Sequence, residues 1–168
     1  MTMHDDAFDI ALNLAEAIAN AQSPDTVWAA ADKAFARLIG HRLFTVLVYE
    51  ADQGLVRRQY SNRPNEYPVS GTKPMGATPW GEHVLHQGKP YIGRDSADIR
   101  WAFFDHELIA SMGLASTCNL PVRAFGRTLG TINLLHEAGH YDDNCLSAGM
   151  VLAGLLAPAM AKAQPTNP

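Results

Sequence analysis

The stretch from Leu134 to Asp143 reads LLHEAGHYDD, and its residues His136 to His140 match the H-E-x-x-H pattern of zinc peptidases. That chemistry needs both histidines on one face of a helix, one turn apart, with the glutamate beside a metal-bound water. Here His136 ends a run that alternates like a strand, and Gly139 weakens any helix starting after it. No histidine or glutamate follows that could be the third ligand. We therefore expect no peptidase and no metal, the open alternative being a loose site of the two histidines beside Asp142 or Asp143.

Other reactive groups are sparse. The two cysteines, Cys118 and Cys145, do not form a C-x-x-C motif and cannot make a disulfide framework, so we expect free thiols in a reducing cytoplasm. There is no G-x-x-x-x-G-K-[ST] phosphate loop. The formal net charge of −4 argues against nucleic-acid binding, and we interpret the basic pair Arg57-Arg58 as a solvated strand edge. The acidic N-terminus and the lack of a long apolar run predict a cytoplasmic protein without a membrane segment.

Periodicity predicts the elements that position these residues. The first half contains helices over 6–21 and 24–40, the second capped by Ser23, then a strand over 43–49 that turns at 51–54 into a partner strand over 55–61. Residues 62–77 are rich in proline and glycine and are expected to be irregular.

The second half begins with a short helix to Gly88 that Thr78 caps, and a brief strand over 90–92 follows. Residues 93–104 are expected to be a loop with at most one helical turn, and Asp105 is expected to cap a helix ending at Met112. Strands over 115–123 and 128–136 form a second hairpin. A closing helix, capped by Asp142 or Asp143, is expected to run to residue 162, with Pro158 as the position where it kinks or ends.

This order predicts an α+β domain with one antiparallel sheet, the terminal helices on one face and the middle insertion on the other. We divide the chain into an N-terminal helix over 1–22, the domain proper over 23–163 and a disordered tail over 164–168.

Small polar residues occupy one parity of each inner strand. Thr131 and Asn133 alternate with Ile132 and Leu134, and the strand before carries Thr117, Asn119 and Pro121 on one parity, while the first strand carries Thr45 and Tyr49. Side chains two residues apart share a face, so these groups form one polar patch. Buried amides and hydroxyls need partners, which a ligand, trapped water or loop backbone can supply.

Three stretches resemble a known family. Residues 112–122, MGLASTCNLPV, followed by 126–135, GRTLGTINLL, resemble the last hairpin of a GAF domain, and 81–90, GEHVLHQGKP, resembles its middle helix and next strand. The resemblance covers roughly residues 25–162 and implies a GAF-like (PAS-related) fold with a ligand pocket between sheet and insertion. Free methionine sulfoxide reductases share that fold and use cysteines of the insertion and its flanking loop. This insertion has none, and Cys118 is expected to face the terminal helices, so that activity is disfavoured.

The resemblance and the polar patch together predict a pocket for a small, flat aromatic or heterocyclic ligand, because the insertion is rich in aromatic residues. The predicted contacts are Trp80, His83, Trp101, Phe103, Asp105, His106, Thr117, Asn119, Thr131 and Asn133. The open alternative for each aromatic ring is that it only closes the core. An enzyme acting on such compounds is the competing hypothesis, with acid–base groups drawn from His83, Asp105 and His106.

We expect no cofactor. No kinase, cyclase or DNA-binding segment accompanies the domain, so a signal would pass through a protein partner or through dimerisation. The alanine-rich terminal helices are the expected homodimer interface.

Overall fold

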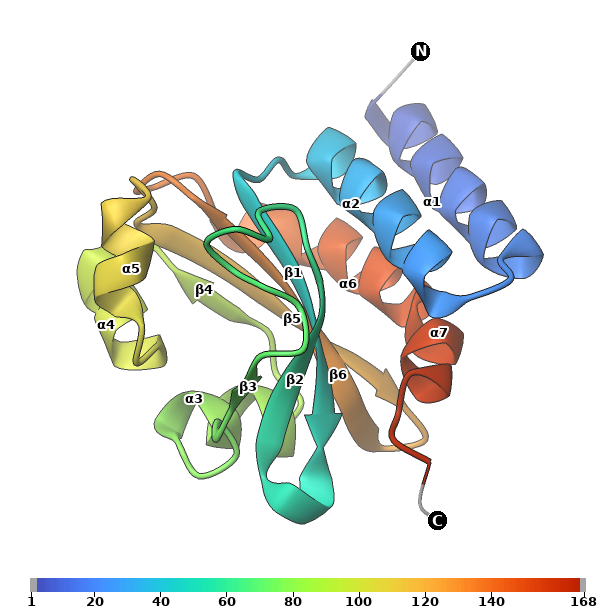
Figure 1. Ribbon diagram of the computed structural model, residues 1–168. Helices are drawn as coiled ribbons and strands as arrows, with labels where there is room; N and C mark the ends of the chain where they lie inside the picture. The colour runs from blue at the N-terminus through green and yellow to red at the C-terminus, as the bar shows by residue number, and fades with distance from the viewer. Residues whose placement is uncertain (1–2, 167–168) are drawn as a thin grey trace.

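The computed structural model describes the backbone of residues 3–166 and the side chains of residues 6–166. Its centre is a six-stranded antiparallel sheet in the order β3-β2-β1-β6-β5-β4, with helices on both faces (Figure 1). The strands are β1 (Leu43–Glu50), β2 (Leu55–Ser61), β3 (Thr72–Lys73), β4 (Tyr91–Gly93), β5 (Ser116–Ala124) and β6 (Arg127–His136). Pairing of β1 with β6 joins the two hairpins, which confirms the predicted single sheet.

The terminal helices form one layer. They are α1 (Met3–Asn20), α2 (Pro24–Leu38), α6 (Leu146–Leu155) and α7 (Ala157–Lys162), and they cover the same sheet face. The apolar parity of the inner strands packs against them, including Val46, Leu120 and Ile132, each fully buried beside Trp28 and Phe35. The closing helix divides at Leu156, as the proline at Pro158 predicts, since proline cannot donate a backbone hydrogen bond.

The insertion covers the opposite face with α3 (Pro79–Gly81), a π-helical turn over Glu82–His86, α4 (Ser96–Ala102) and α5 (His106–Ser111). The expectation of a loop with at most one turn at 93–104 was wrong, because α4 has seven residues. Asp95 caps α4 by accepting from two backbone N–H groups, while Ile99 and Ala102 bury its inner face. This stabilises a helix too short for its periodicity to be seen in the sequence.

Two of the four predicted caps are confirmed, and those at Ser23 and Asp105 are wrong. The Thr78 hydroxyl accepts from the Gly81 N–H at 2.9 Å, and Asp142 Oδ1 accepts from the Asn144 N–H at 2.9 Å. Ser23 precedes α2 as expected, but its hydroxyl lies 3.1 Å from the Thr26 hydroxyl and accepts from no helix N–H. Proline at position 24 already removes one of the N–H groups that a cap would satisfy.

Residues 62–77, expected to be irregular, contain β3, which adds a short edge strand to β2. The predicted tail over 164–168 ends in residues 167–168, outside the described residues, and Gln164 Nε2 donates to the Leu129 carbonyl at 2.6 Å. Between residues 3 and 166, none of the helices combines the length and apolar character that crossing a membrane would need.

Candidate functional site

The polar parity faces the insertion, as the alternation predicts, and its side chains bind one another. Trp80 Nε1 donates to Asn119 Oδ1 at 3.0 Å, and Asn119 Nδ2 donates to Asn133 Oδ1 at 2.9 Å and to the Thr117 hydroxyl at 3.1 Å. Asn133 Nδ2 in turn donates to the Thr131 hydroxyl at 3.0 Å. All five residues are buried. The patch therefore obtains its hydrogen-bond partners within the protein and forms a fixed floor under the insertion.

Beside this floor lies a small cavity of about 30 Å³, between β1, β2 and β6 on one side and the insertion on the other. Of the predicted ligand contacts, Phe103, Asp105 and Asn133 line it. The remaining wall is formed by Leu43, Thr45, Leu47, Arg58, Tyr67, Lys73, Ile109 and Leu135. A cavity of this size holds about one or two water molecules or a group of similar size.

An ionic cluster closes one side of the cavity. Asp105 Oδ2 accepts from Lys73 Nζ and from the Tyr67 hydroxyl, each at 2.5 Å, and the Arg58 guanidinium lies 4.6 Å from the centre of the Tyr67 ring. Burial acts to raise the pKa of Asp105, but the charge and hydrogen bond of Lys73 and the Tyr67 hydroxyl outweigh it and hold the pKa below its ordinary value. Asp105 is therefore a carboxylate that carries its charge at neutral pH.

The expected helix cap at Asp105 was wrong in this respect. Asp105 precedes α5, but its side chain accepts from no N–H of that helix. Lys73 and Tyr67 donate to the carboxylate instead, because the positive charge of Lys73 at 2.5 Å attracts it more strongly than a backbone N–H does.

Two atoms of the cluster have no hydrogen-bond partner. Arg58 Nε and Asp105 Oδ1 are both buried and unpaired. A buried polar atom without a partner costs about 1–3 kcal/mol, and more when the group is charged. The two atoms are a donor and an acceptor that belong to side chains lining the same cavity. Among the described residues, the cavity thus brings together a buried donor and a buried acceptor that have no hydrogen-bond partner.

The sequence interpretation of Arg57-Arg58 as a solvated strand edge was wrong for Arg58, which is only 6 % exposed. The side chain of the preceding residue, Arg57, is 40 % exposed and forms an ion pair with Glu50. Adjacent residues of a strand face opposite sides of the sheet, so Arg58, opposite Leu47, and Arg57, opposite Val48, point in opposite directions. A β-bulge follows Arg58, because Val46 pairs with Tyr60 and leaves Gln59 as an extra residue. Leu47 lines the cavity under the insertion, and its partner Arg58 faces the same side.

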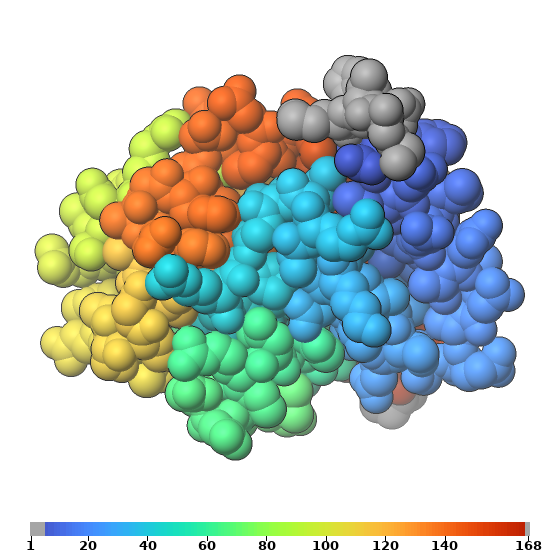
Figure 2. All heavy atoms as spheres, turned by 90° about the horizontal axis from the view of Figure 1, so that it is seen from above, coloured from blue at the N-terminus to red at the C-terminus, as the bar shows by residue number. Residues whose placement is uncertain are grey.

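The 62–71 loop covers Arg58. Pro68 O accepts from Arg58 Nη1 at 2.9 Å, Gly71 O accepts from the Arg58 N–H at 2.9 Å, and the Arg58 carbonyl accepts from the Ser70 N–H at 2.7 Å. Tyr67, in the same loop, reaches Asp105. Figure 2 shows this loop, in green, beside the yellow segment that includes α5. The loop and α5 thus enclose the ionic cluster together.

The other predicted contacts lie further around the insertion. Trp101 is 50 % exposed and stacks on Tyr91 with ring centroids 5.2 Å apart. His83 bonds the Pro90 carbonyl at 3.0 Å, and His106 begins α5, partly buried. Among the described residues, no hydrogen bond joins His83, Asp105 and His106, the three candidate acid–base groups, to one another. The structure therefore does not assemble them as a catalytic set.

The H-E-x-x-H stretch is not helical. His136 is the last residue of β6 and His140 lies in the connector to α6, where their rings stack with centroids 3.6 Å apart. His140 Nε2 lies 3.0 Å from the Ile39 carbonyl oxygen. Among the side chains of residues 6–166, no group of three or more histidines, cysteines, aspartates or glutamates is placed to hold a metal ion.

Cys118 faces the terminal helices and is fully buried, as the alternation predicts. The neighbouring Cys145 thiol and burial both raise the pKa of Cys118, so the thiolate that nucleophilic chemistry needs is disfavoured. Both cysteines are free.

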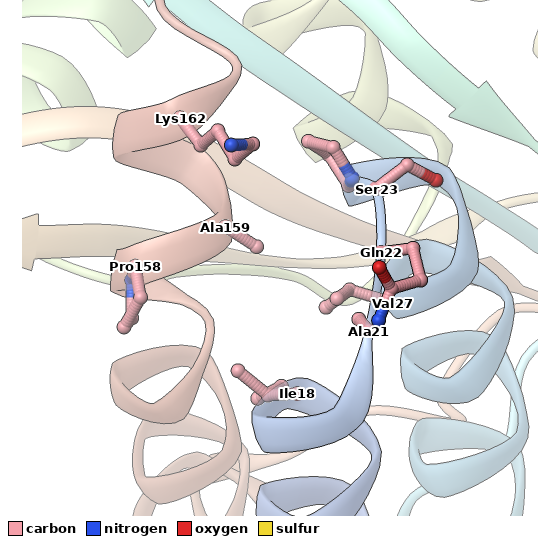
Figure 3. A pocket seen from close by; sticks show the side chains of 9 residues that line it. Ile18, Ala21, Gln22, Ser23, Val27, Pro158, Ala159 and Lys162 are labelled. Carbon is pink, nitrogen blue, oxygen red and sulfur yellow. The ribbon is translucent and has the colours of Figure 1, made fainter.

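A separate hollow of about 170 Å³ opens between the α1–α2 corner and α7 (Figure 3). Ile18, Val27 and Ala159 point into it, and Lys162 is the charged residue of its wall. It belongs to the terminal-helix layer, on the opposite face of the sheet from the ionic cluster, and contains none of the predicted ligand contacts.

Comparison with solved structures gives the same fold. The GAF domain of a phosphoenolpyruvate-protein phosphotransferase from Coxiella burnetii matches with a TM-score of 0.78 and 14% identity, covering 94% of each chain. The GAF domain of the phosphoenolpyruvate-protein phosphotransferase from Acinetobacter matches with a TM-score of 0.74 and 12% identity, covering 93% of each chain. Free methionine-R-sulfoxide reductase from Neisseria meningitidis, solved with its substrate, matches with a TM-score of 0.66 and 13% identity, covering 92% of this chain and 88% of that one.

No curated protein matches the sequence. The sequence model of the family described as GAF domain matches residues 6–161, nearly the whole chain. This agrees with the sheet order and with the insertion over one sheet face. The chain therefore belongs to the GAF domain family.

Proposed function

We propose that this GAF domain is a sensor or regulatory module that binds a small, flat aromatic or heterocyclic molecule between its sheet and its insertion. The observation that carries the proposal is the cavity at the ionic cluster, where two buried polar atoms remain unpaired. Buried polar atoms are normally satisfied, and exceptions mark places where a water, ion or ligand is missing. The Tyr67 and Phe103 rings line the same cavity, and rings of this kind favour flat partners.

The cavity is smaller than such a ligand, so the insertion must move outward when the ligand binds. We expect the movement at Phe103, which follows α4 and lines the cavity, while the contacts of Pro68 and Tyr67 keep Arg58 and Asp105 in place. A movement of this kind would couple ligand binding to the surface of the insertion, which is how a sensor passes on its signal.

Thermal-shift screening and calorimetric titration with aromatic acids, neutral heterocycles and cyclic nucleotides test the proposal. We expect one of the first two classes to raise the melting temperature, because a ligand that binds only the folded state stabilises it. Absence of stabilisation by every class would refute the ligand-binding role.

We propose further that the domain dimerises through its terminal helices. Phe8 and Leu12 of α1 are 69% and 46% exposed, Val151 of α6 is 60% exposed, and α1 packs against α6. Large apolar side chains gathered on one layer favour a protein contact. The alanine-rich helices were the predicted interface, but Ala153 of α6 is buried in the core and is not available for such a contact.

Sedimentation or light scattering of the wild type and of Phe8→Glu tests the dimer. We expect a dimer for the wild type and a monomer for the variant, with unchanged circular dichroism. A wild type that stays monomeric at high concentration would refute it. We propose a cytoplasmic location, which the two free thiols support. We also propose that a protein partner receives the signal of the domain.

A further inference from the structure

The charges around the cavity do not balance. Three charged residues line it, the cations Arg58 and Lys73 and the anion Asp105. Tyr67 stays neutral, since burial and the Asp105 carboxylate both raise the pKa of its hydroxyl. The site therefore holds one net positive charge, and Arg58 is buried to all but 6 % of its surface. Buried charges are normally paired with a counter-charge, so an anion is the group that this cavity favours.

The unpaired atoms define what that anion must carry. Arg58 Nε offers a hydrogen, and Asp105 Oδ1 offers a lone pair. A water molecule would meet both needs but would leave the positive charge unbalanced. A phosphate would bring up to two negative charges, one more than the single net positive charge of the site balances. A carboxylate has one charge and a size near that of the cavity, and a neighbouring N–H or O–H on the same molecule would reach Asp105.

We propose that the site binds an aromatic or heterocyclic carboxylate that carries an N–H or O–H donor next to its carboxylate group. The carboxylate accepts from Arg58 Nε and from a second ammonium hydrogen of Lys73, and the neighbouring donor bonds Asp105 Oδ1. The ring packs against Phe103 and the aliphatic wall. This inference rests on the proposed function, because it names the class of ligand for the same site.

The cluster is arranged to hold such a group rigidly. Pro68 O fixes one guanidinium nitrogen of Arg58, and the Tyr67 hydroxyl and Lys73 fix Asp105 Oδ2. The atoms left free are thus held in position before the ligand arrives, which reduces the entropy lost on binding. The ring of the ligand requires Phe103 to shift, and Phe103 lies 5.9 Å from the Trp80 ring, so binding is expected to change tryptophan fluorescence.

Three matched probes separate the features of the ligand. Pyrrole-2-carboxylate has both the negative charge and an adjacent N–H, furan-2-carboxylate has the charge without the donor, and pyrrole-2-carboxamide has the N–H without the charge. Calorimetric titration of the full chain at neutral pH is expected to give the tightest binding for pyrrole-2-carboxylate. The furan and the amide should each bind at least about tenfold more weakly, because the furan lacks the charge-assisted hydrogen bond to Asp105 and the amide lacks the negative charge opposite Arg58.

Variants of the neighbouring arginines provide the matched control. Arg58→Met should weaken binding of pyrrole-2-carboxylate by at least about tenfold, whereas Arg57→Met, on the other side of the strand, should leave it unchanged. Lys73→Met is the second variant, with an expected loss of similar size, should Arg58→Met fold poorly. Circular dichroism and the melting temperature show whether each variant is folded.

The outcomes distinguish this inference from the proposed function. If pyrrole-2-carboxamide binds as tightly as the carboxylate, or if both folded variants keep wild-type affinity, the inference is overturned while a ligand pocket remains. The same holds if neutral heterocycles stabilise the protein and no carboxylate does. If no member of the wider screen binds, the proposed function fails as well.

Discussion

Replacing Asp105 by asparagine tests the ionic cluster most directly. The substitution keeps the side-chain size but removes the counter-charge of Lys73, which lies 2.5 Å away, and leaves two partly or fully buried cations without an anion. Breaking a buried ion pair costs about 3–5 kcal/mol, while an exposed one is worth about 0–1 kcal/mol. The side chains of Lys73 and Asp105 are 27% and 24% exposed. We therefore expect Asp105→Asn to lower the free energy of unfolding by about 2–3 kcal/mol at pH 7.

The expected loss depends on pH with a definite sign. The pKa of Asp105 is lower in the folded protein than in the unfolded chain, so the folded state favours the carboxylate. Its contribution is fully present above the unfolded-state pKa of about 3.9 and is lost as the pH falls through the folded-state pKa. The difference between wild type and Asp105→Asn should therefore shrink below about pH 4.

Urea unfolding at pH 7 and at pH 3 measures both effects. Asp143→Asn is the control, because Asp143 pairs with Arg94 while remaining 78% exposed, and should change stability by less than about 0.5 kcal/mol. Replacing both partners, in Asp105→Asn with Lys73→Met, should recover part of the loss, since no buried charge is left unpaired within that pair. A loss below about 1 kcal/mol at pH 7, or an equal loss at both pH values, would refute the reasoning.

Three further predictions concern the frame around the site. Gly81→Ala would place a Cβ against the Met75 carbonyl and should destabilise by at least about 2 kcal/mol, whereas Gly154→Ala, on an open helix surface, should stabilise by about 0.5–1 kcal/mol in urea unfolding. Asn119→Ala leaves a buried indole N–H unpaired and should cost about 1–3 kcal/mol; a melting temperature equal to that of the wild type would contradict this. Deleting Gln59 removes the extra bulge residue without turning any strand side chain to the other face, so it should cost less stability than deleting either strand neighbour.

The sequence predicted the sheet and its two faces because alternation carries that information directly. Apolar side chains such as Val46 and Ile132 face the terminal helices, and the polar ones such as Asn119 face the insertion. What the alternation could not show is that the polar residues satisfy one another. Asn119 and Asn133 lie on neighbouring strands in register, and only the pairing of β5 with β6 brings their amides to 2.9 Å.

The ionic cluster was not predicted from the sequence, for a different reason. Arg58 was assigned to the solvent together with Arg57, although adjacent residues of a strand face opposite sides of the sheet. Tyr67 and Lys73 come from the segment without periodicity, so nothing in their spacing indicated that they meet Asp105. A signal was present nonetheless, since Arg58 lies two residues after Val56 and therefore shares the face of an apolar side chain.

The ionic cluster, and not the polar floor, has the hydrogen-bonding atoms that remain free for a ligand. The amides of the floor already have their partners, so a ligand gains little by reaching them and would have to break existing bonds to do so. The atoms still available for hydrogen bonding to a ligand belong to Arg58, in β2, and to Asp105, on the insertion. Ligand choice in this domain should therefore change with substitutions at the cluster, while substitutions in the floor should change stability first. This separates the two sets of residues by experiment, because binding and unfolding can be measured on the same variants.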